Sequence, residues 1–376
     1  MNGTRVTLNL AALAEKGIKM SKILYAASTM SHIHSFHEDY IAALRRDGHE
    51  VLVMAKGEDA DFNIPFEKKM LSGKNTAARR EIRRIVKRER FDCIFLNTTL
   101  AAFHIRLAIP KKDRPRIVNM VHGYLFSEAS HSIKDKILLL CEKLVAKKTD
   151  RLILMNDEDV SIATKNKLAL EPPLFVRGLG ARAHHTETPI SVIRRELDAE
   201  GKFVMTFVGE LSDRKNQRML IFALPLIKFR VPNAMLCLVG DGDKREELEQ
   251  LASSLGVQDS VVFTGRRSNP CDFIRASDLY VSASRIEGMP FNIIEALGTG
   301  KTVLCSDIKG HRDLIKNGES GFLYPCDDVN AFVEAVVSVY EGARPDLDTV
   351  LSVYKSYEWD SVFEDTYSKI KEALEK

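Results

Sequence analysis

Hydrophobic and polar positions alternate in blocks along the chain. Short apolar runs predict buried strands, and the longer amphipathic stretches between them predict helices. Apolar runs occupy residues 23–27, 51–55, 93–96, 117–121, 151–155, 203–208, 235–239, 261–264, 279–282 and 302–306. Helical patterns end at Arg46, cover 134–147, 244–255 and 293–297, and close the chain. Alternation of this kind favours parallel sheets with helices on both faces.

Length and punctuation divide this pattern in two. A chain of 376 residues is longer than one hydrophobic core usually supports. Prolines 172 and 173 and residues 178–189 interrupt the alternation. We therefore expect an α/β protein with two doubly wound, Rossmann-like domains facing across a cleft. The expected parts are an N-terminal extension or upstream start at 1–19, domains at 20–190 and 191–355, and a C-terminal helix at 356–376 that packs back on the first domain.

Composition excludes several classes of protein. Hydrophobic residues make up 45% and charged residues 28%, as in soluble globular proteins. A net charge of +3 is too small to imply nucleic-acid binding. The six cysteines are scattered without a Cys-x-x-Cys pair, which favours reduced thiols in a cytosolic protein without disulfides or zinc. We expect neither a transmembrane helix nor a signal peptide.

The richest motif runs from residue 287 to residue 295. Glu287 and Glu295 stand on either side of a turn that contains Gly288 and Pro290. Proline suits the first helical position, and the free N–H groups of a helix N-terminus stabilise an anion. Glycine lets a ligand approach the backbone closely. Two carboxylates around an anion-binding turn suit a ligand with central phosphates and hydroxyls at both ends, such as a nucleotide sugar.

Other strand ends carry cations. Arg214 and Lys215 follow a strand and can reach a diphosphate, although alone they would be read as a solvated turn. Arg266 and Arg267 follow another strand. The run 298–302, Gly-Thr-Gly-Lys-Thr, lacks the spacer of a phosphate loop and precedes a strand, so we reject that interpretation.

Residues 209–324 resemble the family 4 retaining glycosyltransferases of the GT-B fold. The resemblance rests on Glu-x7-Glu, on Ser306-Asp307-x-x-Gly310 and on Gly318-x-x-Gly321. It implies that Glu287 contacts hydroxyls of the donor sugar, that Glu295 binds the ribose diol and that Lys215 binds the diphosphate. Glu210 replaces the arginine usual in the family, so one phosphate contact is either missing or supplied by Arg214. The remaining implied donor-binding residues are Gly209, Gly288, Met289, Pro290, Phe291, Arg266 and Arg267.

Histidines mark the first domain. His122 follows a strand where the family has a histidine near the reacting diphosphate and sugar. The loop with His32, His34 and His37 resembles a subgroup that acts on lipid-linked sugars in bacterial capsule, exopolysaccharide and O-antigen synthesis. These three can contact the acceptor. An equal alternative is that His32 caps a helix and His37 only packs.

A basic stretch covers residues 74–90. Its narrow apolar stripe is Ala78, Ile82, Ile85 and Val86, and its cations include Arg79, Arg80, Arg83, Arg84 and Lys87. Such a helix is usually a solvated face. The sharper interpretation is attraction to anionic lipid. Aromatic residues for base stacking are absent, which disfavours nucleic acid.

We therefore predict transfer of a sugar, with retention, from a nucleotide-sugar donor (a UDP-sugar) to a polyprenyl-diphosphate-linked saccharide in cell-surface polysaccharide synthesis. No cofactor and no metal ion are expected. The enzyme would be cytoplasmic, at the inner face of the membrane. Two alternatives stay open: a nucleotide-sugar 2-epimerase of the same architecture, and a non-catalytic nucleotide-sugar sensor or scaffold.

Overall fold

The structure is a computed structural model that describes residues 20–67, 72–73, 75–127 and 132–375. The expected extension at 1–19 and the first residue of the basic stretch, Lys74, lie outside this range. The chain divides into two compact units, an N-terminal unit from Met1–Leu179 with Glu364–Lys376 and a C-terminal unit from Gly180–Phe363. The domain limits expected from the sequence stay predictions.

The N-terminal unit is built on a seven-stranded sheet of order β3-β2-β1-β4-β5-β6-β7. Every neighbouring pair is parallel. The strands are β1 (Lys22–Thr29), β2 (Glu50–Lys56), β3 (Phe62–Asn63), β4 (Cys93–Asn97), β5 (Arg116–Val121), β6 (Arg151–Leu154) and β7 (Leu174–Phe175). The expected strands are confirmed, and the two short edge strands β3 and β7 are additions.

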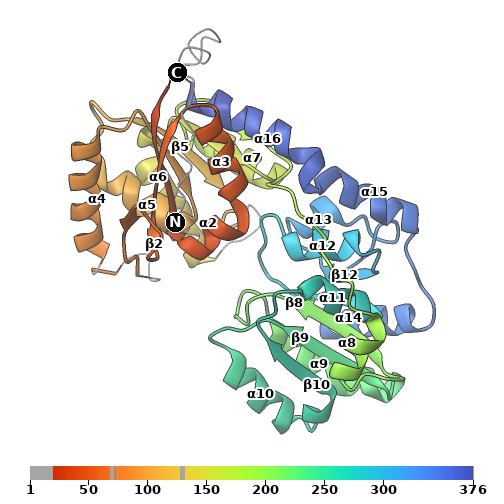
Figure 1. The fold of residues 1–376 in the computed structure, drawn as a ribbon. Coiled ribbons are helices and arrows are strands. Elements are labelled where there is room, and N and C mark those ends of the chain that lie inside the picture. Colours follow the sequence, from red (N-terminus) through yellow and green to blue (C-terminus); the bar gives the residue numbers. More distant parts are fainter. Residues whose placement is uncertain (1–19, 68–71, 74, 128–131, 376) are drawn as a thin grey trace, which may run out of the picture. The chain divides into compact units, whose positions relative to one another are not determined.

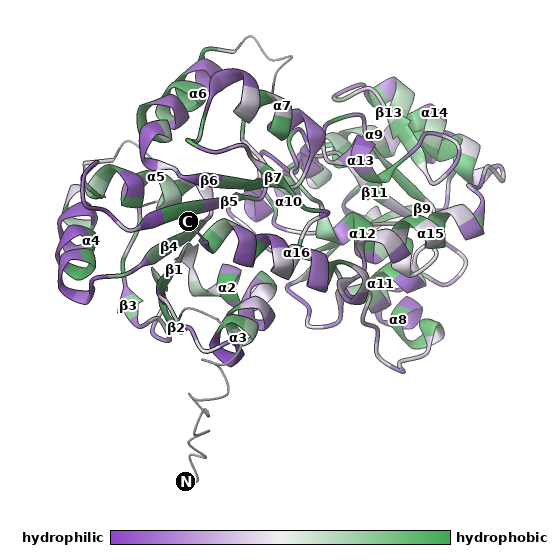
Figure 2. Cartoon of the chain, turned by 90° about the horizontal axis from the view of Figure 1, so that it is seen from above, coloured by the Kyte–Doolittle hydropathy of each residue, from purple (hydrophilic) through white to green (hydrophobic). Residues whose placement is uncertain are grey.

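Helices cover this sheet on opposite sides, with α3 on one and α4 on the other (Figure 1). They are α2 (Met30–Phe36), α3 (Glu38–Arg46), α4 (Asn75–Glu89), α5 (Thr99–Ala108), α6 (Ile133–Val145), the 3₁₀ turn η1 (Ala146–Lys148) and α7 (Asp157–Asn166). In sequence order α4, α5 and α6 pack as neighbours in one layer. Figure 2 shows largely green, hydrophobic strands at the centre of the unit and the purple, hydrophilic face of α4 at its periphery.

The end of the last helix, α16 (Trp359–Leu374), packs on the N-terminal unit, as expected. Arg116 Nε donates to the carbonyl of Ala373 at 2.7 Å, and Arg151 pairs with Glu372 at 2.7 Å. Because these bonds join residues more than two hundred positions apart, they anchor the C-terminus to the sheet. No helix among the described residues is both long enough and apolar enough to span a membrane.

The C-terminal unit holds a six-stranded sheet of order β10-β9-β8-β11-β12-β13, again wholly parallel. Its strands are β8 (Phe203–Val208), β9 (Ala234–Val239), β10 (Val261–Gly265), β11 (Leu279–Ser282), β12 (Val303–Ser306) and β13 (Phe322–Tyr324). The strand order reverses between β8 and β11. Ligands of doubly wound sheets bind outside the carboxyl ends of the strands at such a reversal.

The helices of this unit surround a core of buried aliphatic and aromatic residues. They are α8 (Ile190–Glu196), α9 (Gln217–Arg230), α10 (Arg245–Ser254), η2 (Gln258–Ser260), α11 (Pro270–Ala276), α12 (Phe291–Gly298), α13 (His311–Leu314), α14 (Val329–Tyr340) and α15 (Leu347–Tyr357). The predicted class, two Rossmann-like α/β units with parallel sheets, is confirmed.

Candidate active site

The turn before α12 lies where two loops approach closely. A Cβ atom on Gly310 would stand 2.5 Å from the carbonyl oxygen of Gly288, so only glycine fits there. The amide of Asn292 donates to the carbonyl of Val208 at 2.8 Å and joins the start of α12 to the end of β8. Pro290 precedes the helix instead of being its first residue, which corrects the expected position by one residue.

The turn offers backbone donors to a ligand. Within the described part of the chain, the backbone N–H groups of Gly288, Met289 and Asn292 have no hydrogen-bond partner. N–H groups at the start of a helix, together with the helix dipole, favour an anion. The free backbone donors inferred from the sequence are therefore present, and their use by an anion stays a prediction.

Glu287 lies in this turn as a buried anion. Its side chain is only 7% exposed, with Oε1 at 2.6 Å from Lys215 Nζ and Oε2 at 2.9 Å from an Arg214 guanidinium nitrogen. Burial alone would raise the pKa of Glu287, but the charges of Lys215 and Arg214 outweigh it and lower the pKa to about 2. The carboxylate is therefore ionised at neutral pH.

Lys215 and Arg214 give this cluster a surplus of positive charge. They stand just before α9, and the carbonyl of Arg214 accepts a bond from the N–H of Arg285 at 2.9 Å. Two cations against one carboxylate leave one positive charge over. Such a surplus beside a helix N-terminus suits a diphosphate.

His311 completes the cluster and was not singled out from the sequence. Its Nδ1 lies 2.7 Å from the carbonyl of Ser306, and its buried Nε2 has no partner among the described residues. Burial lowers the pKa of His311 to about 4, although Glu287 opposes the shift. The ring is therefore neutral at pH 7. The available signal was its place directly after Gly310 in the Ser-Asp-x-x-Gly motif.

Glu295, in α12, has a different environment from Glu287. Neither an ion pair nor a hydrogen bond engages its carboxylate within the described residues. Burial raises its pKa to about 7. A carboxylate with both oxygens unused can accept hydrogen bonds from two neighbouring hydroxyls.

The two arginines after β10 differ in their contacts. Both are exposed, but Arg267 pairs with Glu196 at 2.7 Å and lies over the ring of Phe273, whereas Arg266 has no ion pair with any described residue. The turn after β8 has a close approach, because a Cβ atom on Gly240 would stand 1.9 Å from the carbonyl oxygen of Gly209. Glu210, which stands where the family usually has an arginine, is exposed. Arg214 is the arginine of this loop that contacts Glu287.

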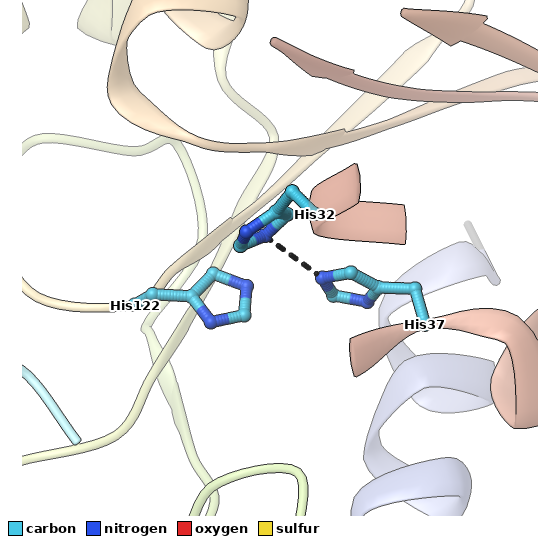
Figure 3. Close-up of side chains that lie close together, drawn as sticks. All are labelled: His32, His37 and His122. Carbon is cyan, nitrogen blue, oxygen red and sulfur yellow. Dashed lines mark hydrogen bonds between the residues drawn. The ribbon is translucent and has the colours of Figure 1, made fainter. Parts of the chain in front are cut away.

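In the N-terminal unit, three histidines come together (Figure 3). His32 lies on α2, His37 between α2 and α3, and His122 directly after β5. His32 Nε2 and His37 Nε2 are 3.2 Å apart, and the ring centre of His122 lies 4.8 Å from that of His32. The hydroxyl of Tyr25 holds His37 Nδ1 at 2.8 Å. We call this group the histidine cluster.

The histidine cluster is uncharged at neutral pH. Burial lowers the pKa of His32 to about 4, and it lowers the pKa of His37 and His122 well below the ordinary value. His122 Nε2 is buried without a partner among the described residues. A buried nitrogen left unpaired is unfavourable unless a ligand uses it.

His34 does not join this group. It is exposed and pairs with Glu38 and, at 3.4 Å, with Asp59. Thr29, and not His32, caps α2 with its side chain. The structure therefore brings together two of the three histidines expected at the acceptor, along with His122.

Comparison with known proteins agrees with both units. Residues 36–160 match the family described as Glycosyltransferase Family 4, and residues 190–350 match the one described as Glycosyl transferases group 1. The two-unit fold and these matches define a glycosyltransferase of the GT-B type. The chain belongs to the family 4 glycosyltransferases.

Relatives extend along most of the chain. One relative, named as a glycosyltransferase, is EpsD of Bacillus subtilis (strain 168), which is 27% identical over 340 residues. The aligned region covers 87% of this chain and 88% of EpsD. An Escherichia coli UDP-Gal:alpha-D-GlcNAc-diphosphoundecaprenol alpha-1,3-galactosyltransferase is 27% identical over 264 residues, 68% of each chain. The fold matches Anabaena Alr3699/HepE in complex with UDP-glucose, with a TM-score of 0.74 at 20% identity over 94% of this chain and 100% of that one.

Proposed function

We propose that this enzyme transfers a sugar from a UDP-linked donor to a saccharide carried on polyprenyl diphosphate, with retention and without a metal ion. The observation that carries the proposal is the buried group of Glu287, Lys215 and Arg214 beside the N-terminus of α12. The Escherichia coli relative, whose name gives a UDP-sugar and a diphosphoundecaprenol-linked acceptor, supports the choice of substrates.

The C-terminal unit would bind the donor. Lys215 and Arg214, with the free N–H groups of Gly288 and Met289, bind the diphosphate in this proposal. Glu287 then turns its oxygens to hydroxyls of the sugar. Glu295 binds the ribose diol, Arg266 lies near the base, and Gly209, without a side chain, lets the phosphates approach the backbone closely.

Chemistry in this proposal needs no covalent nucleophile. The bond between the anomeric carbon and the phosphate oxygen breaks while the acceptor hydroxyl attacks from the same face. The departing phosphate takes the hydroxyl proton. Lys215, Arg214 and the helix N-terminus stabilise the charge that develops on the phosphate, and such preorganised donors usually supply the largest catalytic contribution. Glu287 positions the sugar and does not attack it.

The N-terminal unit would bind the acceptor through the histidine cluster. His122 Nε2 is available to a hydroxyl or phosphate, and His32 and His37 hold its surroundings in the neutral state. The exposed cations of α4 add attraction toward anionic lipid. Among the candidates, Arg79 contacts Thr76, Arg83 binds the carbonyl of Ala108 and Arg84 pairs with Glu81. Arg80 and Lys87 have no such partner within the part of the chain that the structure describes.

The direct test is a panel of nucleotide sugars and lipid-linked acceptors, with nucleotide release as the readout. We expect release that depends on both a UDP-sugar and a polyprenyl-diphosphate saccharide. Interconversion of the sugar without an acceptor would identify an epimerase. Tight binding without turnover would identify a sensor. Either result would reject the proposal.

The pKa of Glu295 predicts how donor binding changes with pH. Because burial raises this pKa to about 7, the carboxylate that accepts the diol is mostly protonated at pH 6 and mostly ionised at pH 8. We expect KM for the donor to fall about tenfold over this interval. Glu295→Gln should have a high KM that no longer changes with pH. A wild-type KM independent of pH, measured under the same conditions, would remove Glu295 from this role.

Protonation of Glu295 should also affect protein stability, which is expected to fall as pH rises, whereas donor binding improves. The folded carboxyl holds its proton above the ordinary pKa of 4.5, so the unfolded chain binds fewer protons between about pH 4.5 and 7. This contribution to the free energy of unfolding therefore declines as pH rises through that window. Glu295→Gln should remove the decline in urea-unfolding measurements.

Metal removal tests a second part of the proposal. Ring nitrogens of His32, His37 and His122 lie within 4.8 Å of one another, and neutral imidazoles are also zinc ligands. We nevertheless expect turnover to be unchanged after EDTA treatment, because the cations of the donor site already supply the positive charge. If EDTA abolishes turnover, and Zn²⁺ restores it in the wild type but not in His37→Ala, then a metal held by the histidine cluster is required.

A further inference from the structure

Helix α6 carries an exposed stripe of large apolar side chains. Ile133, Ile137, Leu140 and Leu144 are 77%, 46%, 65% and 67% exposed. Because an α-helix turns by about 100° per residue, these four lie within about 60° of one another around the helix. We call them the α6 stripe. Contiguous exposed apolar surface of this kind marks an interaction site more often than isolated residues do.

The opposite face of α6 is firmly packed. Leu138 and Leu139 pack against a buried core that includes Tyr124 and Leu152. Glu142 is buried and forms two hydrogen bonds, each of 2.9 Å, with Arg106. These contacts fix the orientation of α6. The face that packs on the core is the one with Leu138, Leu139 and Glu142, and the α6 stripe lies on the other face.

Lysines flank the α6 stripe. Lys134, Lys136, Lys143 and Lys147 are exposed, and no ion pair engages any of them within the described residues. The helix's two acidic residues are different: Glu142 is used by Arg106, and Asp135 is half-buried in the first turn. An apolar stripe between unpaired lysines is complementary to a surface that is apolar inside and anionic outside.

A second exposed apolar face, on α9, lacks this charge pattern. Phe222, Leu226 and Phe229 are 51%, 47% and 87% exposed. The neighbouring cations are engaged inside the C-terminal unit: Arg218 pairs with Glu247, Lys228 binds Ser260 and the carbonyl of Pro232, and Arg230 pairs with Glu334. The α9 face therefore offers apolar area without free positive charge.

We propose that α6 lies in the interface of an anionic lipid bilayer, with the α6 stripe among the acyl chains and its lysines at the phosphate level. Interfacial helices combine these two features. In Figure 2, α6 lies at the outer edge of its unit. Helix α4 belongs to the same layer, with α5 between them, so Arg80 and Lys87 add attraction without insertion.

This placement deepens the proposed function, on which it rests for the lipid-linked acceptor. His122 follows β5 directly, and α6 is the next helix of the described chain after it. A helix in the lipid interface would keep the acceptor-binding unit at the surface that carries polyprenyl diphosphates. The apolar residues of α4 cannot do this, because Ala78, Ile82 and Ile85 are buried in the core.

Flotation of the full chain with lipid vesicles tests the proposal without donor or acceptor. We expect binding to vesicles of phosphatidylglycerol and phosphatidylcholine that exceeds binding to phosphatidylcholine alone. Leu140→Gln with Leu144→Gln should lower the partition coefficient at least about tenfold, since two apolar side chains no longer enter the bilayer. Circular dichroism checks that the variant is folded.

The matched control is Leu226→Gln with Phe229→Gln on α9, which should bind like the wild type. A second pair, Lys136→Gln with Lys143→Gln, should weaken binding about fivefold per residue at low salt and flatten its salt dependence. Wild-type binding by the α6 variant, or loss of binding by the α9 variant, would overturn the proposal. So would a lipid-free dimer, seen by light scattering, that the α6 variant converts to monomer.

Turnover separates this proposal from the proposed function. With a short-chain, water-soluble diphosphate acceptor, the α6 variant should retain wild-type turnover. Vesicle binding as expected, with no transfer to any acceptor, would reject the proposed function and leave the lipid contact standing. Transfer as expected, with no binding to vesicles, would reject the lipid contact alone.

Discussion

Lys215→Met is expected to lower kcat by about 10²- to 10³-fold, the loss typical when one preorganised donor to a developing negative charge is removed. Lys215 Nζ is nearly buried and 2.6 Å from Glu287, so water cannot easily replace it. In the proposed reaction the leaving diphosphate gains charge as its bond to the sugar breaks, so the lysine would act more strongly in the transition state than on the bound donor. KM for the donor should change less than kcat.

Stability must be separated from catalysis in this variant. Removing one partner of a buried ion pair leaves the other charge uncompensated, which destabilises proteins by about 3–5 kcal/mol. Arg214 still contacts Glu287, so we expect the smaller end of that range in urea unfolding. The double variant Lys215→Met with Glu287→Gln removes both charges and should recover part of the stability without recovering turnover.

The control is Lys202→Met, which removes a surface lysine paired with the fully exposed Asp198. Exposed pairs contribute about 0–1 kcal/mol, so both stability and kcat should remain close to wild type. Wild-type kcat in Lys215→Met would remove Lys215 from catalysis. Recovery of kcat in the double variant would show that Lys215 serves only to neutralise Glu287.

The sequence predicted the sheets well because their strands are buried on both faces. Such strands appear as continuous apolar runs, and β8 and β11 have the expected bounds. The edge strands β3 and β7 were missed because two residues make no pattern, and Leu174–Phe175 follows directly after two prolines. Strand content was thus predictable where burial was complete.

Contacts between side chains were much less accessible. The bond from Arg214 to Glu287 joins residues 73 positions apart, and the sequence suggested separate roles for them. His32 and His37 would lie on different sides of one continuous helix, since five residues turn about 140° beyond a full turn. They meet because the helix breaks at His37, which lies between the end of α2 and the start of α3. A break of this kind has no clear sequence signal.

The exposure of the α6 stripe was equally hard to predict from the sequence. An amphipathic pattern predicts which residues share a face, but an apolar stripe usually faces the core. The sequence drew attention to α4 through its charges, and the structure buries the apolar stripe of that helix. Only the packing of α6 by Leu138, Leu139 and Glu142 shows that its other stripe stays outside.

The second large effect concerns His122. We expect His122→Ala to lower kcat by about 10²-fold or more, the range for a group that donates or accepts a hydrogen bond or proton at the reacting atoms. Its Nε2 has no partner among the described residues, so the fold does not use this nitrogen. The free energy of unfolding should therefore fall by no more than about 1 kcal/mol, because an unsatisfied buried polar atom is removed along with the packing of the ring.

Variants of two other histidines in the same unit serve as controls for this prediction. His37→Ala leaves the buried Tyr25 hydroxyl without its 2.8 Å bond and should reduce stability by about 1–3 kcal/mol. His34→Ala, on the exposed face of α2, should change neither kcat nor stability appreciably. Added imidazole should restore part of the turnover of His122→Ala, because the ring leaves a cavity of its own shape. Equal losses of kcat in His34→Ala and His122→Ala would mean that the loss comes from the α2 segment as a whole and not from the unpaired nitrogen of His122.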